Sequence, residues 1–188
     1  VMEQYNTERL RLRPLGGEDT DEVWKLVSDE AIGGQLHCGV QRTREEAAQL
    51  VQSYLDDPDR LPFAVLEGES GAFAGVLILS RYEEAACEDT VYLGRPFWNR
   101  GYARELIRAS FSLAADLLGA REMVNYVKLD NTPSVRVQES LGFRLDHVEY
   151  YDNCPSGLGI FRRPLTAAEV IHPGRWRHFK GGEYRVLS

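Results

Sequence analysis

Segments with the two-residue hydrophobic period of strands and segments with the helical period follow one another along most of the chain. The predicted strands cover residues 9–13, 63–66, 74–80, 90–93, 123–129, 143–151 and 159–163. The predicted helices cover residues 18–28, 43–55, 101–118 and 130–141. Three consecutive strands with helices before and after them favour an α/β fold in which one mixed sheet carries helices on both faces.

Several helix ends are marked by single residues. Thr43 and Glu46 form a capping box, so the second helix is expected to begin there. Gly119 is expected to end the longest helix. Asn131 and Pro133 open the last one, with proline in the first turn.

The bulk composition limits the kind of protein this is. The chain has 188 residues, of which 43% are hydrophobic, and this suits one compact domain. The formal net charge is -7, so no bulk attraction to nucleic acid or to an anionic membrane is expected. No apolar run approaches the ~20 residues of a membrane helix, and no export signal is visible.

The three cysteines, Cys38, Cys87 and Cys154, lie far apart in the sequence. This spacing indicates neither a disulfide framework nor a metal site. Reduced thiols and a cytoplasmic location are expected.

The segment from Val91 to Arg104 is the most informative about function. It reads as a strand, a tight loop that contains glycine and arginine, and the start of the longest helix. The first N–H groups of a helix have no partner inside it and attract anions such as phosphate, and Gly101 allows a ligand to approach the backbone closely. The segment is neither a Walker loop nor a Rossmann fingerprint, because their glycine spacings are absent.

Trp98-Asn99-Arg100-Gly101-Tyr102-Ala103 resembles the pyrophosphate loop of the GNAT acetyltransferase superfamily, although Trp98 replaces its usual first residue. A second motif, Asn131-x-x-Ser134 followed by Leu141-Gly142-Phe143, is similar to the RimJ/RimL-like branch of that superfamily. Residues 9–14 resemble the first strand of the branch. The resemblance covers residues 7–151 and implies a mostly antiparallel sheet that is splayed where acetyl-coenzyme A enters.

The resemblance also implies roles in cofactor binding. Main-chain groups of Val91, Tyr92 and Leu93 would lie along the pantetheine arm, and one amide would hold the thioester carbonyl. The loop residues Asn99, Arg100, Gly101, Tyr102, Ala103 and Arg104 would surround the pyrophosphate, and Asn131 would hydrogen-bond the pantetheine. The alternatives are a buried strand, solvated arginines and a helix N-cap.

Acetyl transfer to an amine requires two proton transfers. Ser134 matches the serine proposed to protonate the leaving thiolate, and an ordinary first-turn serine is the alternative. Gln138 stands where other branches carry a tyrosine acid. Glu88 and Asp89, expected just before the cofactor strand, are candidates for the base, with Glu83 and Glu84 as alternatives; all four carboxylates are also consistent with a solvated turn.

The predicted reaction is direct attack by a primary amine in a ternary complex. The His37-Cys38 pair suggests a covalent intermediate, but adjacent residues of an extended chain point apart, so none is expected. A protein N-terminus, a polyamine, an aminoglycoside and an amino acid all remain open as acceptors. The competing hypotheses are a non-catalytic coenzyme A-binding module and an interaction module on the same fold.

The chain after residue 165 differs in composition from the rest. We therefore predict an acetyltransferase domain over residues 1–165 and a C-terminal extension over residues 166–188. Residues 176–187 resemble the first two strands of a small bacterial domain of unknown function, and a hairpin is an alternative. A homodimer is expected by analogy with the superfamily.

Overall fold

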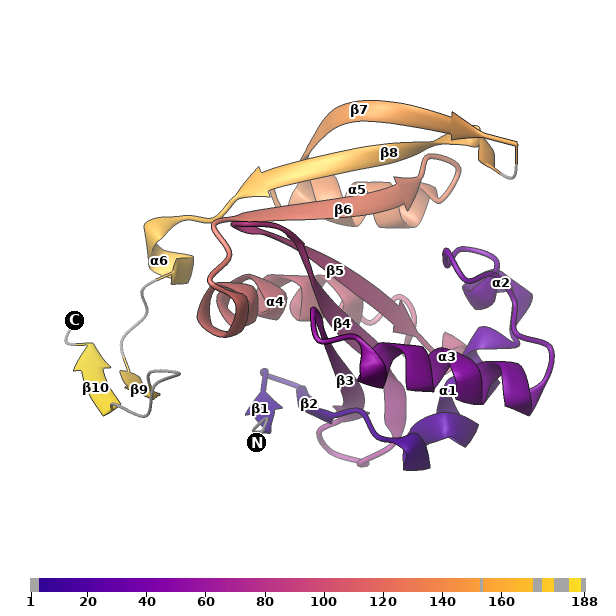
Figure 1. Ribbon diagram of the computed structural model, residues 1–188, viewed down its shortest axis with the longest axis horizontal. Helices are drawn as coiled ribbons and strands as arrows, with labels where there is room; N and C mark the ends of the chain where they lie inside the picture. Colours follow the sequence, from indigo (N-terminus) through magenta and orange to yellow (C-terminus); the bar gives the residue numbers. More distant parts are fainter. Residues whose placement is uncertain (1–3, 153, 171–173, 178–182, 187–188) are drawn as a thin grey trace.

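The computed structural model describes residues 4–152, 154–170, 174–177 and 183–186. Its main sheet has eight strands in the order β1-β2-β3-β4-β5-β6-β8-β7 (Figure 1). These strands are β1 (Tyr5–Asn6), β2 (Leu10–Pro14), β3 (Arg60–Glu67), β4 (Phe73–Glu83), β5 (Ala86–Leu93), β6 (Glu122–Lys128), β7 (Arg144–Tyr151) and β8 (Cys154–Pro164). All neighbours are antiparallel except β5 and β6, which are parallel, so the mixed, mostly antiparallel sheet is confirmed.

The contact between β5 and β6 is short, and the sheet opens there into two arms. Within these strands, the register holds two pairs, Ala86 with Glu122 and Cys87 with Met123. Beyond them β5 continues along β4 to Leu93, and β6 continues along β8 to Lys128. Figure 1 shows the two strands diverging, which confirms the predicted splay.

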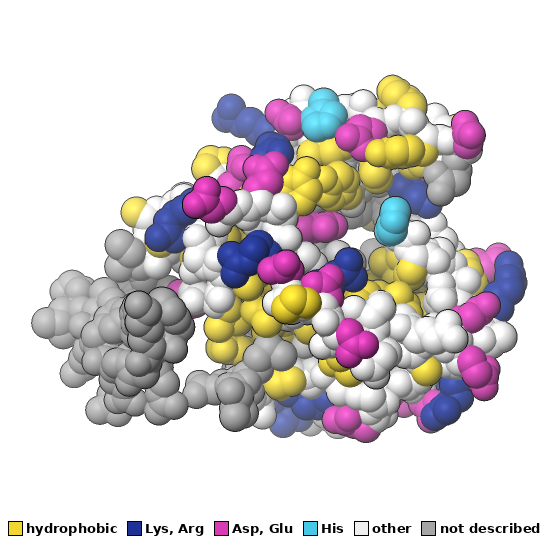
Figure 2. Space-filling view, in the orientation of Figure 1, with side chains coloured by type: hydrophobic (Ala, Val, Ile, Leu, Met, Phe, Trp, Pro, Cys, Tyr) yellow, Lys and Arg dark blue, Asp and Glu magenta, His cyan; other side chains and the backbone are white. Residues whose placement is uncertain are grey.

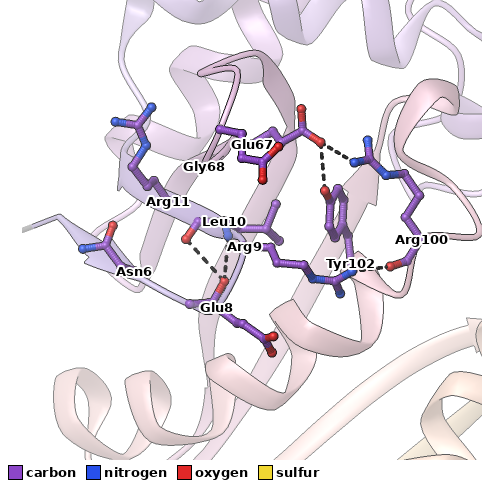
Figure 3. A pocket seen from close by; sticks show the side chains of 11 residues that line it. Asn6, Glu8, Arg9, Leu10, Arg11, Glu67, Gly68, Arg100 and Tyr102 are labelled. Carbon is purple, nitrogen blue, oxygen red and sulfur yellow. Dashed lines mark hydrogen bonds and ion pairs between the residues drawn. The ribbon is translucent and has the colours of Figure 1, made fainter.

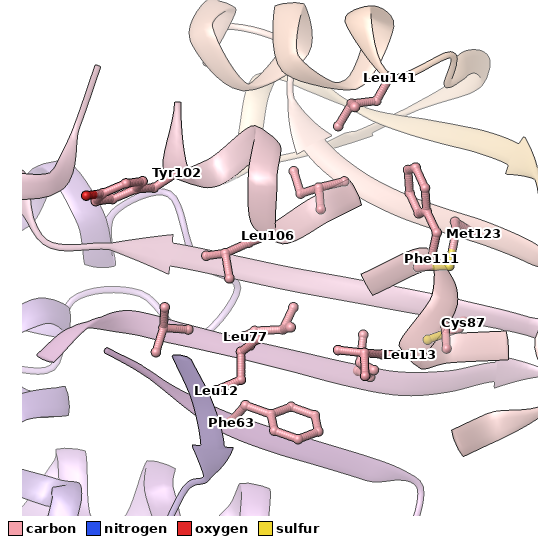
Figure 4. Close-up of a cluster of buried hydrophobic side chains, with 14 of the residues drawn as sticks. Leu12, Phe63, Leu77, Cys87, Tyr102, Leu106, Phe111, Leu113, Met123 and Leu141 are labelled. Carbon is pink, nitrogen blue, oxygen red and sulfur yellow. The ribbon is translucent and has the colours of Figure 1, made fainter. Parts of the chain in front are cut away.

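Helices cover both faces of the sheet. The α-helices are α1 (Thr20–Val27), α2 (Glu30–Gly33), α3 (Arg44–Asp56), α4 (Tyr102–Leu118), α5 (Thr132–Ser140) and α6 (Ala167–Val170). Helices α1 and α3 contact β4 and β3 from one side, and α4 contacts β4 and β5. Because strand side chains alternate between faces, each face has its own hydrophobic core. Figure 4 shows part of the core under α4, which includes Leu12, Phe63, Leu77, Leu106 and Phe111.

The helix ends follow the local signals in the sequence. Thr43 and Glu46 form the reciprocal capping box of α3. Gly101 and Gly119 flank α4 with φ angles of 79° and 70°, in the left-handed region that glycine adopts readily. The Asn131 side chain caps α5 by accepting a hydrogen bond from the Ser134 N–H.

The helix predicted over residues 18–28 is partly wrong. A 3-10 turn over Gly17–Asp19 precedes α1, and a separate short helix, α2, follows it. Asp29 starts α2 because its side chain accepts from the Ala31 N–H and also pairs with Arg95. Arg95 lies far away in the sequence, so the local pattern does not predict this helix.

The strand predicted over residues 90–93 begins earlier, at Ala86. Glu84 and Ala85 alone form the turn between β4 and β5. Tight turns of this length usually carry glycine or asparagine, and this one carries neither. The prediction that Glu83, Glu88 and Asp89 lie in a loop is therefore wrong, because all three lie in strands.

Beyond β8, the short helix α6 packs against α4. Its Glu169 forms an ion pair with Arg163 of β8 (Nη2···Oε1 2.7 Å). Strands β9 (Gly174–Arg177) and β10 (Glu183–Val186) pair in an antiparallel way as a separate two-stranded sheet. Residues 178–182 and 187, which also belong to the tail segment 176–187 that resembles a small bacterial domain, lie outside the described residues.

Candidate active site

The edge of β5 that faces β6 is open beyond the short contact. The N–H and C=O groups of one strand residue point to the same side, and successive residues alternate. The Asp89 N–H points toward β6, where it donates to Asn125 Oδ1 (N···O 3.2 Å), and the Gly94 N–H donates to Ala74 of β4. Val91 therefore presents its N–H and C=O to the open side, where no described residue pairs with them.

The neighbours of Val91 are already engaged. The Tyr92 main chain points to β4, opposite Val76, so the expectation that Tyr92 lends main-chain groups to the open edge is wrong. Its side chain is buried under α1 and α3. The Leu93 C=O points to the open side but accepts a hydrogen bond from Trp98 Nε1 at 2.7 Å. Trp98 thus ties the loop before α4 to the end of β5.

The N-terminus of α4 lies directly after this loop. Asn99, with φ of 56°, and Gly101 both have left-handed backbone conformations. The N–H groups of Tyr102, Ala103 and Arg104 come too early to bond within the helix, and no other described residue accepts from them. The helix dipole adds a partial positive charge, so this turn can hold an anion.

The two arginines of the loop differ in their surroundings. Arg100 pairs with Glu67 (Nη2···Oε1 2.6 Å) and lies 4.7 Å from the centre of the Tyr102 ring. Arg9 covers the same ring at the same distance and donates to the Arg100 C=O. These groups line a pocket of about 480 Å³ beside β2 (Figure 3). Arg104 is exposed and has no ion pair with a described residue, so it is the freer cation.

Helix α5 lies on the other arm, where it contacts β6. Asn131 Oδ1 accepts from the Ser134 N–H (3.3 Å), which confirms the N-cap interpretation of Asn131. The amide nitrogen of Asn131 and the hydroxyl of half-buried Ser134 have no hydrogen-bond partner among the described residues. Both groups are thus available to a ligand.

Glu88 and Asp89 point to opposite faces of β5, because they are consecutive strand residues. Glu88 is half-buried on the face of α1 and α3 and has no hydrogen bond or ion pair with a described residue. Burial raises the pKa of its carboxyl, while the nearby Arg60 opposes this effect. It is therefore a carboxylate whose proton affinity is increased and whose oxygens are free.

Asp89 lies in the core beneath α4 and is 7% exposed. Its oxygens accept from Asn125 Nδ2 at 2.8 Å and from the Ser110 hydroxyl. Burial raises its pKa to about 6, and these two hydrogen bonds oppose the shift. The expectation that Asp89 faces an acceptor cleft together with Glu88 is wrong, since its side chain is enclosed on the other face.

The sequence matches the family described as acetyltransferase (GNAT) domain over residues 9–144. The chain belongs to the GNAT acetyltransferase family. It is an N-acetyltransferase that uses acetyl-coenzyme A. The open Val91 amide and the free N–H groups of α4 fit this cofactor, whose amide-containing arm ends in a pyrophosphate.

Curated and solved relatives of this GNAT acetyltransferase cover most of its length. An FsC-acetyl coenzyme A-N(2)-transacetylase of Aspergillus fumigatus is 28% identical over 88% of this chain and 77% of its own. RimL, a ribosomal L7/L12 α-N-protein acetyltransferase solved with coenzyme A, matches with a TM-score of 0.75 and is 20% identical in sequence. The match covers 87% of this chain and 98% of RimL. Spermidine N-acetyltransferase of Vibrio cholerae, solved with coenzyme A and spermine, matches with a TM-score of 0.72 and is 18% identical in sequence. The match covers 83% of this chain and 95% of that enzyme.

The second face of the GNAT acetyltransferase sheet is hollowed. Figure 2 shows the hollow between the arm of β7 and β8 and the layer of α2 and α3. Lys128 of β6 crosses between the two arms and donates to the Gly34 C=O at 2.7 Å. The Tyr126 ring lies on this face and packs edge-to-face on Tyr82 with ring centres 5.9 Å apart. Burial raises the pKa of Tyr126, and Tyr82 and the charge of nearby Glu88 add to this shift.

The loop after α2 contributes His37 and Cys38. His37 is exposed, while burial raises the pKa of the half-buried Cys38 thiol. A thiol is nucleophilic as its thiolate, so this shift disfavours Cys38 as a nucleophile. All three cysteines are free, and none of the described helices combines the length and the apolar composition needed to cross a membrane.

Sequence reasoning missed the buried polar residues Ser110 and Asn125. Asn125 has a visible signal, because it occupies an inward position of a strand between Met123 and Val127, both buried. A buried amide at such a position needs hydrogen-bond partners. Its partners belong to β5 and α5, and the sequence alone does not bring them together.

Proposed function

We propose that this acetyltransferase transfers the acetyl group directly to a neutral primary amine while both substrates are bound. The observation that carries the proposal is the open β5 edge at Val91, which leads to the free N–H groups of α4. One N–H on an open strand is suited to a carbonyl oxygen, and several at a helix start are suited to a pyrophosphate. Acetyl-coenzyme A carries both groups.

In this proposal each residue has a distinct task. The Val91 N–H holds the thioester carbonyl and stabilises the negative charge that develops on its oxygen. The N–H groups of residues 99–104 hold the pyrophosphate, and Arg104 adds a charge-assisted contact. We assign no such contact to the Arg100 side chain, because Glu67 already binds it. The amide nitrogen of Asn131 donates to the pantetheine arm.

Proton transfer is assigned to two side chains on opposite faces of the sheet. Glu88, three residues before Val91 on β5, accepts a proton from the incoming ammonium through a water molecule. The neutral amine then attacks the thioester carbon, the C–N bond forms and the C–S bond breaks. The Ser134 hydroxyl gives its proton to the departing thiolate sulfur, as the Asn-x-x-Ser resemblance implies. The nitrogen releases its surplus proton to solvent, and solvent returns a proton to the Ser134 oxygen. Asp89 has no part in these transfers because it is enclosed.

The acceptor is proposed at the level of a primary amine, either a protein N-terminus or a small molecule. RimL and the spermidine acetyltransferase share this fold and differ in acceptor, so the fold does not select between the two. The half-buried carboxylate of Glu88 and the ring of Tyr126 suit an ammonium group. We further propose the RimJ/RimL-like branch, a cytoplasmic location and a homodimer.

The test is calorimetric titration with acetyl-coenzyme A of the natural chain and of Gly101→Glu. The added carboxylate lies where the pyrophosphate would bind, so we expect binding to be abolished. Gly119→Glu is the matched control, because it makes the same change at a left-handed glycine at the other end of α4, and it should bind normally.

An amine panel that follows thiol release then tests catalysis. Turnover with a primary amine supports the proposed reaction. Binding without turnover on any amine would favour the non-catalytic module instead. Absence of binding by the natural chain would contradict the proposal at its first step.

A further inference from the structure

Four buried polar side chains meet beneath the point where β5 and β6 part. Asp89 of β5, Ser110 of α4, Asn125 of β6 and Gln138 of α5 are 7%, 0%, 2% and 4% exposed. A polar group buried in this way is costly unless it is hydrogen-bonded. The proposed reaction uses none of these side chains, so their presence requires another explanation.

Asn125 is the centre of the cluster. Its Oδ1 accepts from the Asp89 N–H at 3.2 Å, and its Nδ2 donates to Asp89 Oδ1 at 2.8 Å and to Gln138 Oε1 at 3.0 Å. If the amide were flipped, Asn125 Oδ1 would face Asp89 Oδ1 and Gln138 Oε1, and Asn125 Nδ2 would face the Asp89 N–H. Neither arrangement can form hydrogen bonds. The amide is thus fixed in one orientation, with both N–H groups and its oxygen in use.

The Asn125 side-chain amide replaces the next main-chain hydrogen bond that would join β5 to β6. Main-chain pairing of β5 with β6 ends at Cys87 and Met123. Asp89 is the next β5 residue whose N–H points toward β6, and a side chain rather than a main chain receives it. Asn125 therefore sets how far apart the strands lie immediately before Val91.

The same amide reaches the helix that carries Ser134. Gln138 lies four residues after Ser134 on α5, so the two side chains project from the same side of the helix. The Gln138 side chain is 4% exposed and points to Asn125. One buried amide thus connects the strand that carries the Val91 amide to the helix that carries the Ser134 hydroxyl.

We propose that Asn125 and Gln138 are positioning residues that hold the Val91 amide and the Ser134 hydroxyl in register across the splay. This inference rests on the proposed function, which assigns those two groups to the thioester oxygen and the sulfur. Gln138, where other branches carry a tyrosine acid, acts here through Asn125 and not as a proton donor.

The test compares Gln138→Leu, Gln138→Glu and Asn125→Ser with Met123→Ala, a control that removes buried volume from β6 without touching the amide. Gln138→Leu and Asn125→Ser should lower kcat by about 10- to 100-fold, as expected for small misplacements of reacting groups. The KM for the amine should not change, because the amine enters from the other face. Gln138→Glu keeps an oxygen for Asn125 Nδ2 and should restore kcat to near its natural value.

Hydrogen exchange of the protein without substrate provides a readout that does not depend on catalysis. Faster exchange over residues 86–93 and 131–140 is expected in Gln138→Leu and Asn125→Ser, and not in Met123→Ala. The inference is overturned if both variants keep the natural kcat and exchange, or if Met123→Ala loses kcat to the same extent. If the natural chain shows no turnover, the proposed function fails separately, and exchange alone decides whether the amide holds the two arms.

Discussion

Glu88 and Asp89 are adjacent in the sequence, yet β5 places them in opposite environments. Glu88 has free oxygens on the hollowed face, and Asp89 is enclosed by Ser110 and Asn125. Burial raises the pKa of both carboxyls. The first shift favours proton transfer from the substrate ammonium to Glu88, and the second affects the stability of the fold.

Replacing Glu88 tests its role as the base. Glu88→Gln should lower kcat/KM by about 100-fold, in the range expected for general base catalysis. In the natural enzyme, activity should rise with pH through the raised pKa of Glu88, because the carboxylate must be ionised to accept a proton. The variant should lose this acidic limb of the pH profile.

Glu84→Gln is the control for that prediction. Glu84 lies in the exposed turn before β5, and the variant should keep both the rate and the pH profile. Equal losses in the two variants would point to a general charge effect and would contradict a specific role of Glu88.

Asp89 should make stability depend on pH. Its folded pKa of about 6 lies above its ordinary value of 3.8, so the folded state holds the proton more tightly than the unfolded state. The free energy of unfolding should therefore fall as the pH rises from about 4 to about 6, by roughly 3 kcal/mol. Urea unfolding across this range measures the loss.

Asp89→Asn removes the titrating group while its amide can still accept from Asn125 and donate to Ser110. The variant should lack this part of the pH dependence and should be more stable than the natural chain above pH 6. Partial desolvation raises the pKa of the exposed Asp116 to about 7, but this group titrates in both proteins and cancels in the comparison. A variant that is less stable than the natural chain at pH 8 would contradict the prediction.

At the level of elements, boundaries set by local chemistry could be predicted, and those set by distant partners could not. Thr43 and Gly119 act within one turn of their helices, so α3 begins and α4 ends as expected. Helix α2 depends on Asp29 and its partner Arg95, and the start of β5 depends on its register with β4. Neither partner is visible in the local pattern.

The same distinction applies to the candidate site. Gly101 and Ser134 lie in contiguous motifs, and the family match over residues 9–144 supports that resemblance. The proposed roles of Asn125 and Gln138 depend on the distance between β5 and β6 just beyond Cys87 and Met123. This distance follows from how the two arms of the sheet pack. Alternation predicts that Glu88 and Asp89 point apart only after both are placed in one strand.

The loop before α4 offers a prediction about an element. Trp98→Phe keeps the aromatic ring but loses the donor to the Leu93 C=O. Loss of one hydrogen bond, worth about 0.5–1.5 kcal/mol, should loosen the loop and raise the Kd for acetyl-coenzyme A by about 3- to 10-fold. The kcat at saturation should remain close to the natural value. An unchanged Kd would show that the loop is held by other contacts.

At the scale of the whole molecule, α6 joins the C-terminal end of β8 to α4. Arg163 donates to the Leu141 C=O, pairs with Glu169 and lies 4.2 Å from the centre of the Phe111 ring. Its side chain is 13% exposed, so the pair is shielded from solvent. The chain through α6 is thus packed on the fold, five residues beyond the domain boundary that we predicted.

Glu169→Gln tests this packing. The variant leaves Arg163 without its counter-charge and should lower stability by about 1–3 kcal/mol, or roughly 2–10 °C in Tm. Affinity for acetyl-coenzyme A should not change, because α6 is remote from Val91. The control is Glu30→Gln, since the Glu30–Arg42 pair is exposed and should contribute little. Equal Tm shifts in the two variants would contradict the assignment.

Strand β5 presents one face to the layer of α1 and α3 and the other to α4, with the open amide of Val91 at its edge. In the proposed reaction the donor and the acceptor therefore reach the same carbon from opposite sides of one strand. Neither acetyl-coenzyme A nor the amine blocks the binding site of the other, so binding in random order is expected. Substitutions in the loops over the hollow can also change the acceptor specificity without altering the β5 edge and the start of α4, which bind acetyl-coenzyme A in this proposal.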